Sequence, residues 1–289
     1  MRSKIVGLHY LLLSILLSLN IVLRSQDLKT LEIDSILPIS PLLYEISGMC
    51  IFNNKIYALN DGRNGSYIFK LDLASGTLEE KYRISNLRNK DWEELSISGA
   101  YLYIGDFGNN SGERRDLAIY RIRIDSLQYP DPPVLTTGIE YLQQKNAKVH
   151  KRDNEWDCEA MTVTPDGIYC FSKNRKDLTT NIYHVSEGKN NILSPVDVFD
   201  AGFLVTGAYY HQGGRSLYLC GYYKNETYLL QFKNTDGVST GGRYTKYILP
   251  ELKHTQVESV FVSGNFLYLA SEKTAVRQAI YIISMSRLD

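Results

Sequence analysis

Acidic side chains recur in this chain at the start of short runs of alternating apolar residues. Asp91 and Glu93 stand two residues apart before one such run, and Asp157 and Glu159 stand in the same relation before another. Glu258 begins a third run of the same kind. Carboxylates that are brought together repel one another unless a cation or a basic side chain compensates them. Calcium accepts roughly six to eight oxygen ligands in flexible geometry, so such a cluster suits it.

The elements that must position these acids form an internal repeat. An apolar residue followed by tyrosine occurs five times, at Ile56-Tyr57, Leu102-Tyr103, Ile168-Tyr169, Leu217-Tyr218 and Leu267-Tyr268. Each pair follows a short apolar run that ends in a turn, and a further strand-like run comes after it. This pattern predicts a three-stranded β-meander in every repeat.

A fourth strand is expected in the first four units, over residues 78–84, 134–142, 193–199 and 244–249. The fifth unit has none, whereas the segment 28–37 is strand-like and has no unit of its own. The simplest solution is a closed ring in which this N-terminal segment supplies the missing outer strand, since closure leaves no open sheet edge. The sequence therefore predicts an all-β fold, a β-propeller.

The number of blades follows from the spacing of the units. Their first aligned positions lie 46, 66, 47 and 52 residues apart, at Ser47, Glu93, Glu159, Thr206 and Glu258. A four-stranded blade takes about 40 to 50 residues. Five blades fit best, with residues 129–133 and 145–155 as loop within the long second interval. A sixth, degenerate blade in that interval is the alternative.

In an antiparallel meander the start of the first strand and the end of the second lie at the same end of the blade. Repeat-aligned positions there should converge on one face near the axis. The predicted metal ligands on this face are Glu93, Glu159, Glu258, Asp91, Asp157 and Glu45. The rest of the predicted ligand-binding face is Asp61, Asp106, Lys173, Arg175, Glu272 and Lys273. In the alternative interpretation, the acids pair with these basic residues or face solvent.

The unit heads carry a family resemblance. EISGM at Glu45, DWEELSI at Asp91 with YIGDFGNN, DCEAMTV at Asp157 with FSKNR, and VESVFV at Val257 with ASEK resemble the secreted bacterial propellers grouped as phytase-like, esterase-like or SdiA-regulated proteins. The resemblance implies a calcium-associated propeller with an acidic axial face. It also implies, as a second possibility, hydrolysis of a phosphoester or ester, for which the chain offers few basic residues.

The N-terminus predicts export. Arg2 and Lys4 precede an apolar run, and Arg24 ends it. We interpret residues 1–26 as a signal peptide and 27–289 as one propeller domain, with a retained membrane anchor as the alternative. A cleaved signal would leave no membrane insertion and a secreted, periplasmic or cell-surface protein.

Composition excludes one class of partner. The 32 basic residues balance the 32 acidic ones, so no overall basic field attracts nucleic acid. The four cysteines lack a CxxC spacing, and three lie in apolar runs, which indicates buried free thiols, although an exported chain could form disulfides. No GxSxG, HExxH or P-loop motif occurs. Whether the protein is an enzyme stays open at this point. The sequence favours a monomeric binding module for a small ligand or a surface protein.

Overall fold

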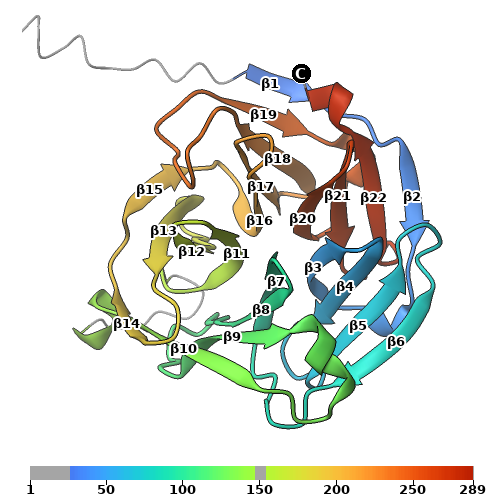
Figure 1. The fold of residues 1–289 in the computed structure, drawn as a ribbon. Coiled ribbons are helices and arrows are strands. Elements are labelled where there is room, and N and C mark those ends of the chain that lie inside the picture. Colours follow the sequence, from blue (N-terminus) through green and yellow to red (C-terminus); the bar gives the residue numbers. More distant parts are fainter. Residues whose placement is uncertain (1–26, 147–153, 289) are drawn as a thin grey trace, which may run out of the picture.

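The computed structural model describes residues 27–146 and 154–288. Within them, five β-sheets, each built on an antiparallel meander, are arranged around a central axis (Figure 1). The first blade consists of β3 (Ile46–Phe52), β4 (Lys55–Asn60), β5 (Tyr67–Asp72) and β6 (Leu78–Arg83). The second consists of β7 (Trp92–Ser98), β8 (Tyr101–Asp106), β9 (Leu117–Arg123) and β10 (Val134–Tyr141), with β14 (Asn190–Leu193) at its edge.

The remaining blades repeat this order from the axis outward. The third consists of β11 (Cys158–Thr164), β12 (Gly167–Ser172), β13 (Thr179–Val185) and β15 (Asp197–Asp200). The fourth consists of β16 (Leu204–His211), β17 (Ser216–Tyr223), β18 (Glu226–Phe232) and β19 (Tyr244–Ile248), with β1 (Asp27–Thr30) at its edge. The fifth consists of β20 (Val257–Ser263), β21 (Phe266–Ser271), β22 (Ala279–Ser284) and β2 (Ser35–Pro38).

The chain is a five-bladed β-propeller, as the repeat predicted. The alternative of six blades is wrong, because the described residues form five sheets and the long second interval contains the extended outer strands of the second blade. Short 3₁₀ turns are the only helical elements in this part of the chain: η1 (Pro41–Leu43), η2 (Ile124–Gln128), η3 (Gln143–Asn146), η4 (Pro250–Leu252) and η5 (Met285–Leu288).

Two expected strands are each divided in the structure. The N-terminal segment forms β2, which pairs antiparallel with β22 and closes the ring, and also β1, which pairs parallel with β19 of the fourth blade. Between them Leu31 is buried and the backbone N–H of Ile33 donates to Glu251 Oε1 at 2.9 Å, so the chain turns from one blade to the next. The expected strand 193–199 likewise divides into β14 on the second blade and β15 on the third.

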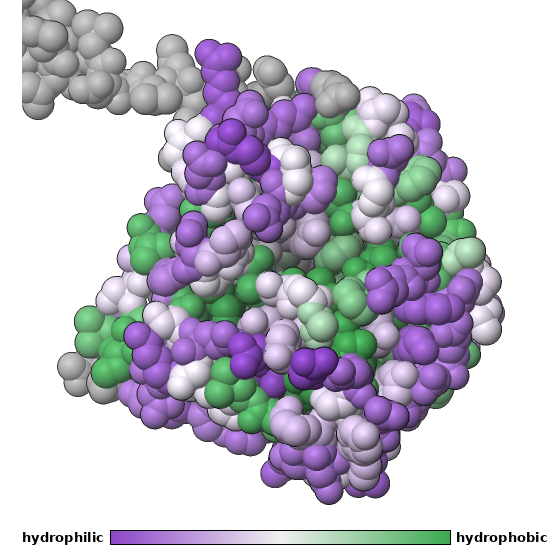
Figure 2. Space-filling model, in the orientation of Figure 1, coloured by the Kyte–Doolittle hydropathy of each residue, from purple (hydrophilic) through white to green (hydrophobic). Residues whose placement is uncertain are grey.

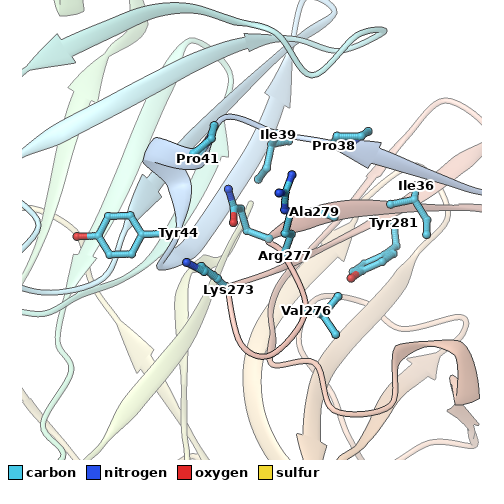
Figure 3. Close-up of a pocket in the computed structure, with 11 residues that line it drawn as sticks. Ile36, Pro38, Ile39, Pro41, Tyr44, Lys273, Val276, Arg277, Ala279 and Tyr281 are labelled. Carbon is cyan, nitrogen blue, oxygen red and sulfur yellow. The ribbon is translucent and has the colours of Figure 1, made fainter.

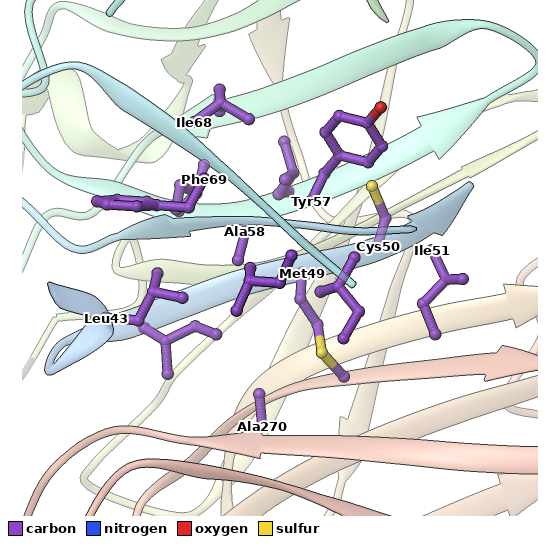
Figure 4. Close-up of a cluster of buried hydrophobic side chains, with 14 of the residues drawn as sticks. Leu43, Met49, Cys50, Ile51, Tyr57, Ala58, Ile68, Phe69 and Ala270 are labelled. Carbon is purple, nitrogen blue, oxygen red and sulfur yellow. The ribbon is translucent and has the colours of Figure 1, made fainter. Parts of the chain in front are cut away.

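Apolar side chains fill the space between neighbouring blades. Figure 4 shows one such cluster, in which Met49 and Cys50 of β3 lie with Tyr57 of β4, and Ala270 of the fifth blade lies beside them. All four cysteines are free and buried, as the sequence indicated. This packing fixes the blades against one another and so fixes the ends of their inner strands.

The inner strands meet around the axis. β3, β7, β11, β16 and β20 each contact the inner strand of the next blade, and the fifth contacts the first. Their inward edges have unpaired backbone groups, which neighbouring blades satisfy: Met49 N–H donates to Ser259 Oγ at 3.0 Å, and Tyr210 N–H to Thr162 Oγ1 at 2.8 Å. Ala208 N–H donates to the buried Glu94 at 3.4 Å. The ring is thus held together across its centre.

Candidate functional site

Each inner strand contains a β-bulge at the repeat-aligned position. The pairing register with the second strand of the blade shifts between the residues that flank this position in all five blades. The bulged residues are Ser47, Glu93, Glu159, Thr206 and Glu258. A bulge redirects a side chain out of the regular alternation of a strand. The aligned positions are therefore structurally equivalent.

The two hydroxyl residues at this position have structural roles. Ser47 Oγ donates to the carbonyl of Trp92 at 2.9 Å, and Thr206 Oγ1 donates to the carbonyl of Val257 at 2.5 Å. Each bond joins one blade to the next. The three glutamates at the equivalent position, which are at most 8% exposed, remain for other interactions.

Glu93 lies in a compact group of three carboxylates with Asp61 and Asp91. Oxygen atoms of these side chains all lie within 4.8 Å of one another. Asp61 follows β4 of the first blade, and Asp91 precedes β7 of the second, so the group spans the boundary between two blades. This arrangement brings together two of the predicted metal ligands and one residue from the wider predicted face.

Two glycines allow the carboxylates to approach the backbone. A Cβ atom on Gly108 would lie 2.1 Å from Glu93 Oε1 and 2.6 Å from Asp91 Oδ2. A Cβ atom on Gly62 would lie 2.5 Å from Asp91 Oδ1. Neither position can carry a side chain without displacing an acid, so the loops after β4 and β8 shape the site.

The group has too few donors for its oxygens. The backbone N–H of Gly62 donates to Asp61, whereas no donor within the described residues hydrogen-bonds the side chain of Asp91 or Glu93. Burial, followed by the charge of Asp61, raises the pKa of Asp91 to about 6. Burial and then the charges of Glu159 and Asp61 raise the pKa of Glu93 well above its usual range. A bound cation would relieve this repulsion.

The neighbouring acids on the third blade have basic partners. Lys173 Nζ lies 2.7 Å from Glu159 Oε2, and both side chains are buried. Arg175 pairs with Asp157 and stands 3.9 Å from Glu159 Oε1, an oxygen that is buried without a hydrogen-bond partner. Burial opposes the charge of Lys173, but the combined attraction of Glu159 and of further groups, among them Glu258 and Asp157, raises the lysine pKa. In the third blade the acids therefore pair with basic residues, which was the alternative to metal binding.

Asp106, at the end of β8, is fully buried. Its Oδ1 accepts from the backbone N–H of Asp91 at 3.1 Å and from Arg114 Nη2 at 2.8 Å, while Oδ2 has no partner in the described part of the chain. Burial raises the pKa of Asp106, and Arg114 opposes this. Asp106 therefore positions the backbone of Asp91 and neutralises an arginine close to the carboxylate group.

The acids of the fifth blade form a separate pair with raised pKa values. Glu272 accepts a hydrogen bond from Gln256. Burial raises the pKa of Glu258 to about 7, although Lys173 opposes this, and burial with the charge of Glu258 raises that of Glu272 to about 8. At neutral pH these carboxyls hold protons more readily than ordinary glutamates do.

The last two predicted residues lie at the margin. Glu45 precedes β3 and accepts from Asn64 Nδ2, and it lines a cavity of about 500 Å³ beside Asp61 and Asp91. Lys273 instead lines a different cavity, between the fifth blade and the segment leading into the first. The predicted face therefore divides into the group of Asp61, Asp91 and Glu93, which has few hydrogen-bond donors, and the ion-paired acids of the third blade. Lys273 lies outside both.

Sequence reasoning missed the residues that complete the site. Arg114, Asn109 and Ser111 line the 500 Å³ cavity together with the acids. They lie in the loop 107–116, where no repeat spacing predicts position. The sequence signals in this loop were the YIGDFGNN motif, which contains Asn109, and Gly108, which lies two residues after the end of β8 at the point of close contact.

Comparison with known proteins supports the repeat architecture. Residues 91–110 and 255–274 match the LVIVD repeat. Both segments cover the start of an inner strand and the end of the second strand, where Glu93 and Glu258 lie. No protein with a curated description matches the chain in sequence.

Several solved structures are similar in fold at low identity. A putative gluconolactonase is 11% identical with a TM-score of 0.49, over 86% of this chain and 77% of that one. A β-propeller domain of Cps50 (Swd1) from Myceliophteria thermophila is 12% identical with a TM-score of 0.47, over 87% and 98%. A chain of a nidogen/laminin complex is 14% identical with a TM-score of 0.44, over 83% and 76%.

The predicted signal peptide, residues 1–26, lies outside the described residues. Within the described ranges, no helix is long and apolar enough to cross a membrane.

Proposed function

We propose that this protein is an exported, monomeric binding module that holds calcium on the axial face at Asp61, Asp91 and Glu93. The observation that carries the proposal is the group of three carboxylates within 4.8 Å, two of which receive no hydrogen bond within the described residues. Glu93 is buried and Asp91 is half-buried, and acids removed from water without donors or cations are costly. A divalent cation removes that cost in the folded state.

The ligand atoms favour calcium over transition metals. The group offers carboxylate oxygens from two blades, and it contains no histidine or cysteine among the described residues. Zinc prefers nitrogen and sulfur ligands, and magnesium requires near-ideal octahedral geometry. Carboxylates from two loop ends and a strand bulge suit the flexible coordination of calcium, and the phytase-like resemblance implies the same ion.

The cavity beside the carboxylates supports binding of a polar ligand. It measures about 500 Å³ and is lined by Asn109, Asn110 and Ser111 in addition to Asp61 and Asp91. Amide and hydroxyl groups hydrogen-bond hydroxyl-rich or anionic ligands. The ligand that suits this cavity is a small polar molecule, or a side chain of a surface protein, that also coordinates the bound ion.

Hydrolysis of a phosphoester or ester is the second candidate. Arg63, Lys90 and Arg114 line the same cavity, and a bound cation can polarise an ester and activate water. However, Lys90 pairs with Asp116 and Arg114 with Asp106, so much of this basic charge is already neutralised. The geometry therefore supports binding better than phosphate transfer.

Isothermal titration of calcium into chelator-treated protein tests the proposal. We expect wild-type protein to release or absorb heat on binding, and Glu93→Gln to weaken binding by about tenfold or more because one anionic ligand is lost. Glu187→Gln, an exposed residue paired with Arg121, is the matched control and should bind like the wild type. A ligand specific for the folded state stabilises it by about 2.7 kcal/mol at roughly a hundredfold excess over Kd.

Wild-type protein that shows neither calcium heat nor a change in melting temperature would contradict the proposal. A nitrophenyl phosphate or nitrophenyl ester assay with calcium separates the two candidates. Calcium-dependent turnover that Glu93→Gln abolishes would establish the hydrolase, and calcium binding without turnover supports the binding module.

A further inference from the structure

A second cavity lies at the closure of the ring, separate from the three carboxylates. It measures about 680 Å³ and is formed between the fifth blade and the segment that leads into the first. Its floor is the β2–β22 pair, in which Ile36 stands opposite Tyr281 and Pro38 opposite Ala279. Figure 3 shows these side chains together with the loop between β21 and β22. Cross-strand partners share one face of a sheet, so the floor is continuous and apolar.

The apolar surface of this cavity is unusually exposed. Ile36 is 60% exposed and Val276, on the loop opposite, is 43% exposed. Figure 2 shows white and green surface between purple areas on the side where Figure 1 places β22 and β2. Large apolar side chains grouped in a concave site, in contrast to isolated ones, indicate a binding site.

The rim of the cavity has two positive charges without counter-charges. Lys273 and Arg277 lie on the loop between β21 and β22, and both are exposed. Neither side chain forms an ion pair or a hydrogen bond with the described residues, and no acidic residue lines the cavity. Lys173 and Arg114, on the axial face, are both paired with carboxylates. The two unpaired side chains at the rim, Lys273 and Arg277, therefore favour binding of an anion in this cavity.

We propose that this cavity binds a small amphipathic anion, an apolar body that carries one carboxylate or sulfonate group. Pockets for small molecules measure roughly 300 to 1,000 Å³ and are mostly apolar with a few polar groups. The apolar body lies on Ile36, Val276 and Tyr281. The anionic group lies against Lys273 and Arg277, and a guanidinium binds a carboxylate through two parallel hydrogen bonds.

Fluorescence titration with anilinonaphthalene sulfonate, an amphipathic anion, tests this site on the folded protein. The titration is done in chelator, so the result does not depend on calcium. We expect saturable binding that octanoate displaces and octylammonium does not, because the two competitors share a chain and differ in charge. Lys273→Glu combined with Arg277→Glu should weaken binding by about tenfold or more.

A charge-matched control and an apolar variant complete the test. Arg88→Glu combined with Lys189→Glu reverses one exposed arginine and one exposed lysine away from both cavities, and should leave the dye affinity unchanged. Ile36→Ser should weaken binding without a change in charge. Equal affinity in the Lys273/Arg277 variant, or equally good displacement by octylammonium, would overturn the proposal while leaving the calcium site untouched.

Discussion

Glu93 and Glu159 occupy the same position in two successive repeats and have different environments. Glu93 lies with Asp61 and Asp91 and has no hydrogen-bond donor within the described residues, whereas Glu159 is paired with Lys173 at 2.7 Å. The sequence placed both at the axial end of an inner strand. It did not separate their roles, because Asp61 and Lys173 both stand at repeat-aligned strand ends, and the repeat spacing does not say which side chains on one face come into contact.

Replacing Lys173 by Met should destabilise the fold. The substitution leaves the carboxyl of Glu159 buried without its cation, and breaking a buried pair in this way costs about 3–5 kcal/mol. Urea unfolding of the single variant and of Lys173→Met combined with Glu159→Leu measures the effect. The double variant should recover part of the loss, and a single variant as stable as the wild type would show that the pair contributes little.

Gly108→Ala should impair calcium binding. The added Cβ would lie 2.1 Å from Glu93 Oε1, so the carboxylate must move. Gly241→Ala is the matched control, since nothing lies within 4 Å of its Cβ position. Calorimetry should show weaker calcium binding only for Gly108→Ala. Unchanged affinity would mean that Glu93 does not coordinate the ion in the described conformation.

At the level of elements, the repeat of apolar-tyrosine pairs was sufficient to predict the meander and the ring. Leu102 and Leu267 are buried, and the tyrosines that follow them in the second strands are buried too, in the apolar clusters between neighbouring blades. The sequence analysis did not predict the bulges, although the spacing of apolar residues changes from two to three across each of them, as in Val257, Val260 and Val262. The bulges nevertheless determine where the side chains of the site lie, since each bulge redirects the aligned side chain at the axial end of its strand.

The closure by β2 gives a prediction at the same scale. Two truncated proteins, one beginning at Ser35 and one at Ile39, both lack β1 and differ only in β2. The shorter protein should aggregate or melt at a clearly lower temperature, because the β22 edge is exposed. Light scattering and thermal unfolding compare the two. Equal melting temperatures and equal monomer content would contradict the closure.

At the scale of the whole molecule, the acidic face makes stability depend on pH when calcium is absent. The pKa of Glu258 is raised from 4.5 to about 7 and that of Glu272 to about 8. Between the ordinary pKa of 4.5 and these raised values, the folded state therefore binds more protons than the unfolded state. The free energy of unfolding falls as pH rises through this range. Their contribution is complete below about pH 4.5 and lost above about pH 8.

Thermal unfolding in chelator at about pH 6 and about pH 9 tests this dependence. The wild type should be less stable at the higher pH, and Glu258→Gln combined with Glu272→Gln should reduce the difference because neither amide titrates. A wild-type stability that rises with pH, or a variant with the same slope, would contradict the assignment.

Export is the second whole-molecule prediction. The charged start and apolar run of residues 1–26 predict a signal peptide that is removed near residues 25–27. Mass spectrometry of the protein from its native host decides the matter. A mature N-terminus at this place confirms export, and an intact Met1 in the membrane fraction would establish an anchor.

A crystal structure of the protein grown in calcium, with anomalous scattering data, would show whether calcium binds between the first two blades. We expect an anomalous peak about 2.3–2.6 Å from carboxylate oxygens of Asp61, Asp91 and Glu93. A structure in which these side chains enclose only water, or in which calcium binds elsewhere and this group is empty, would contradict it.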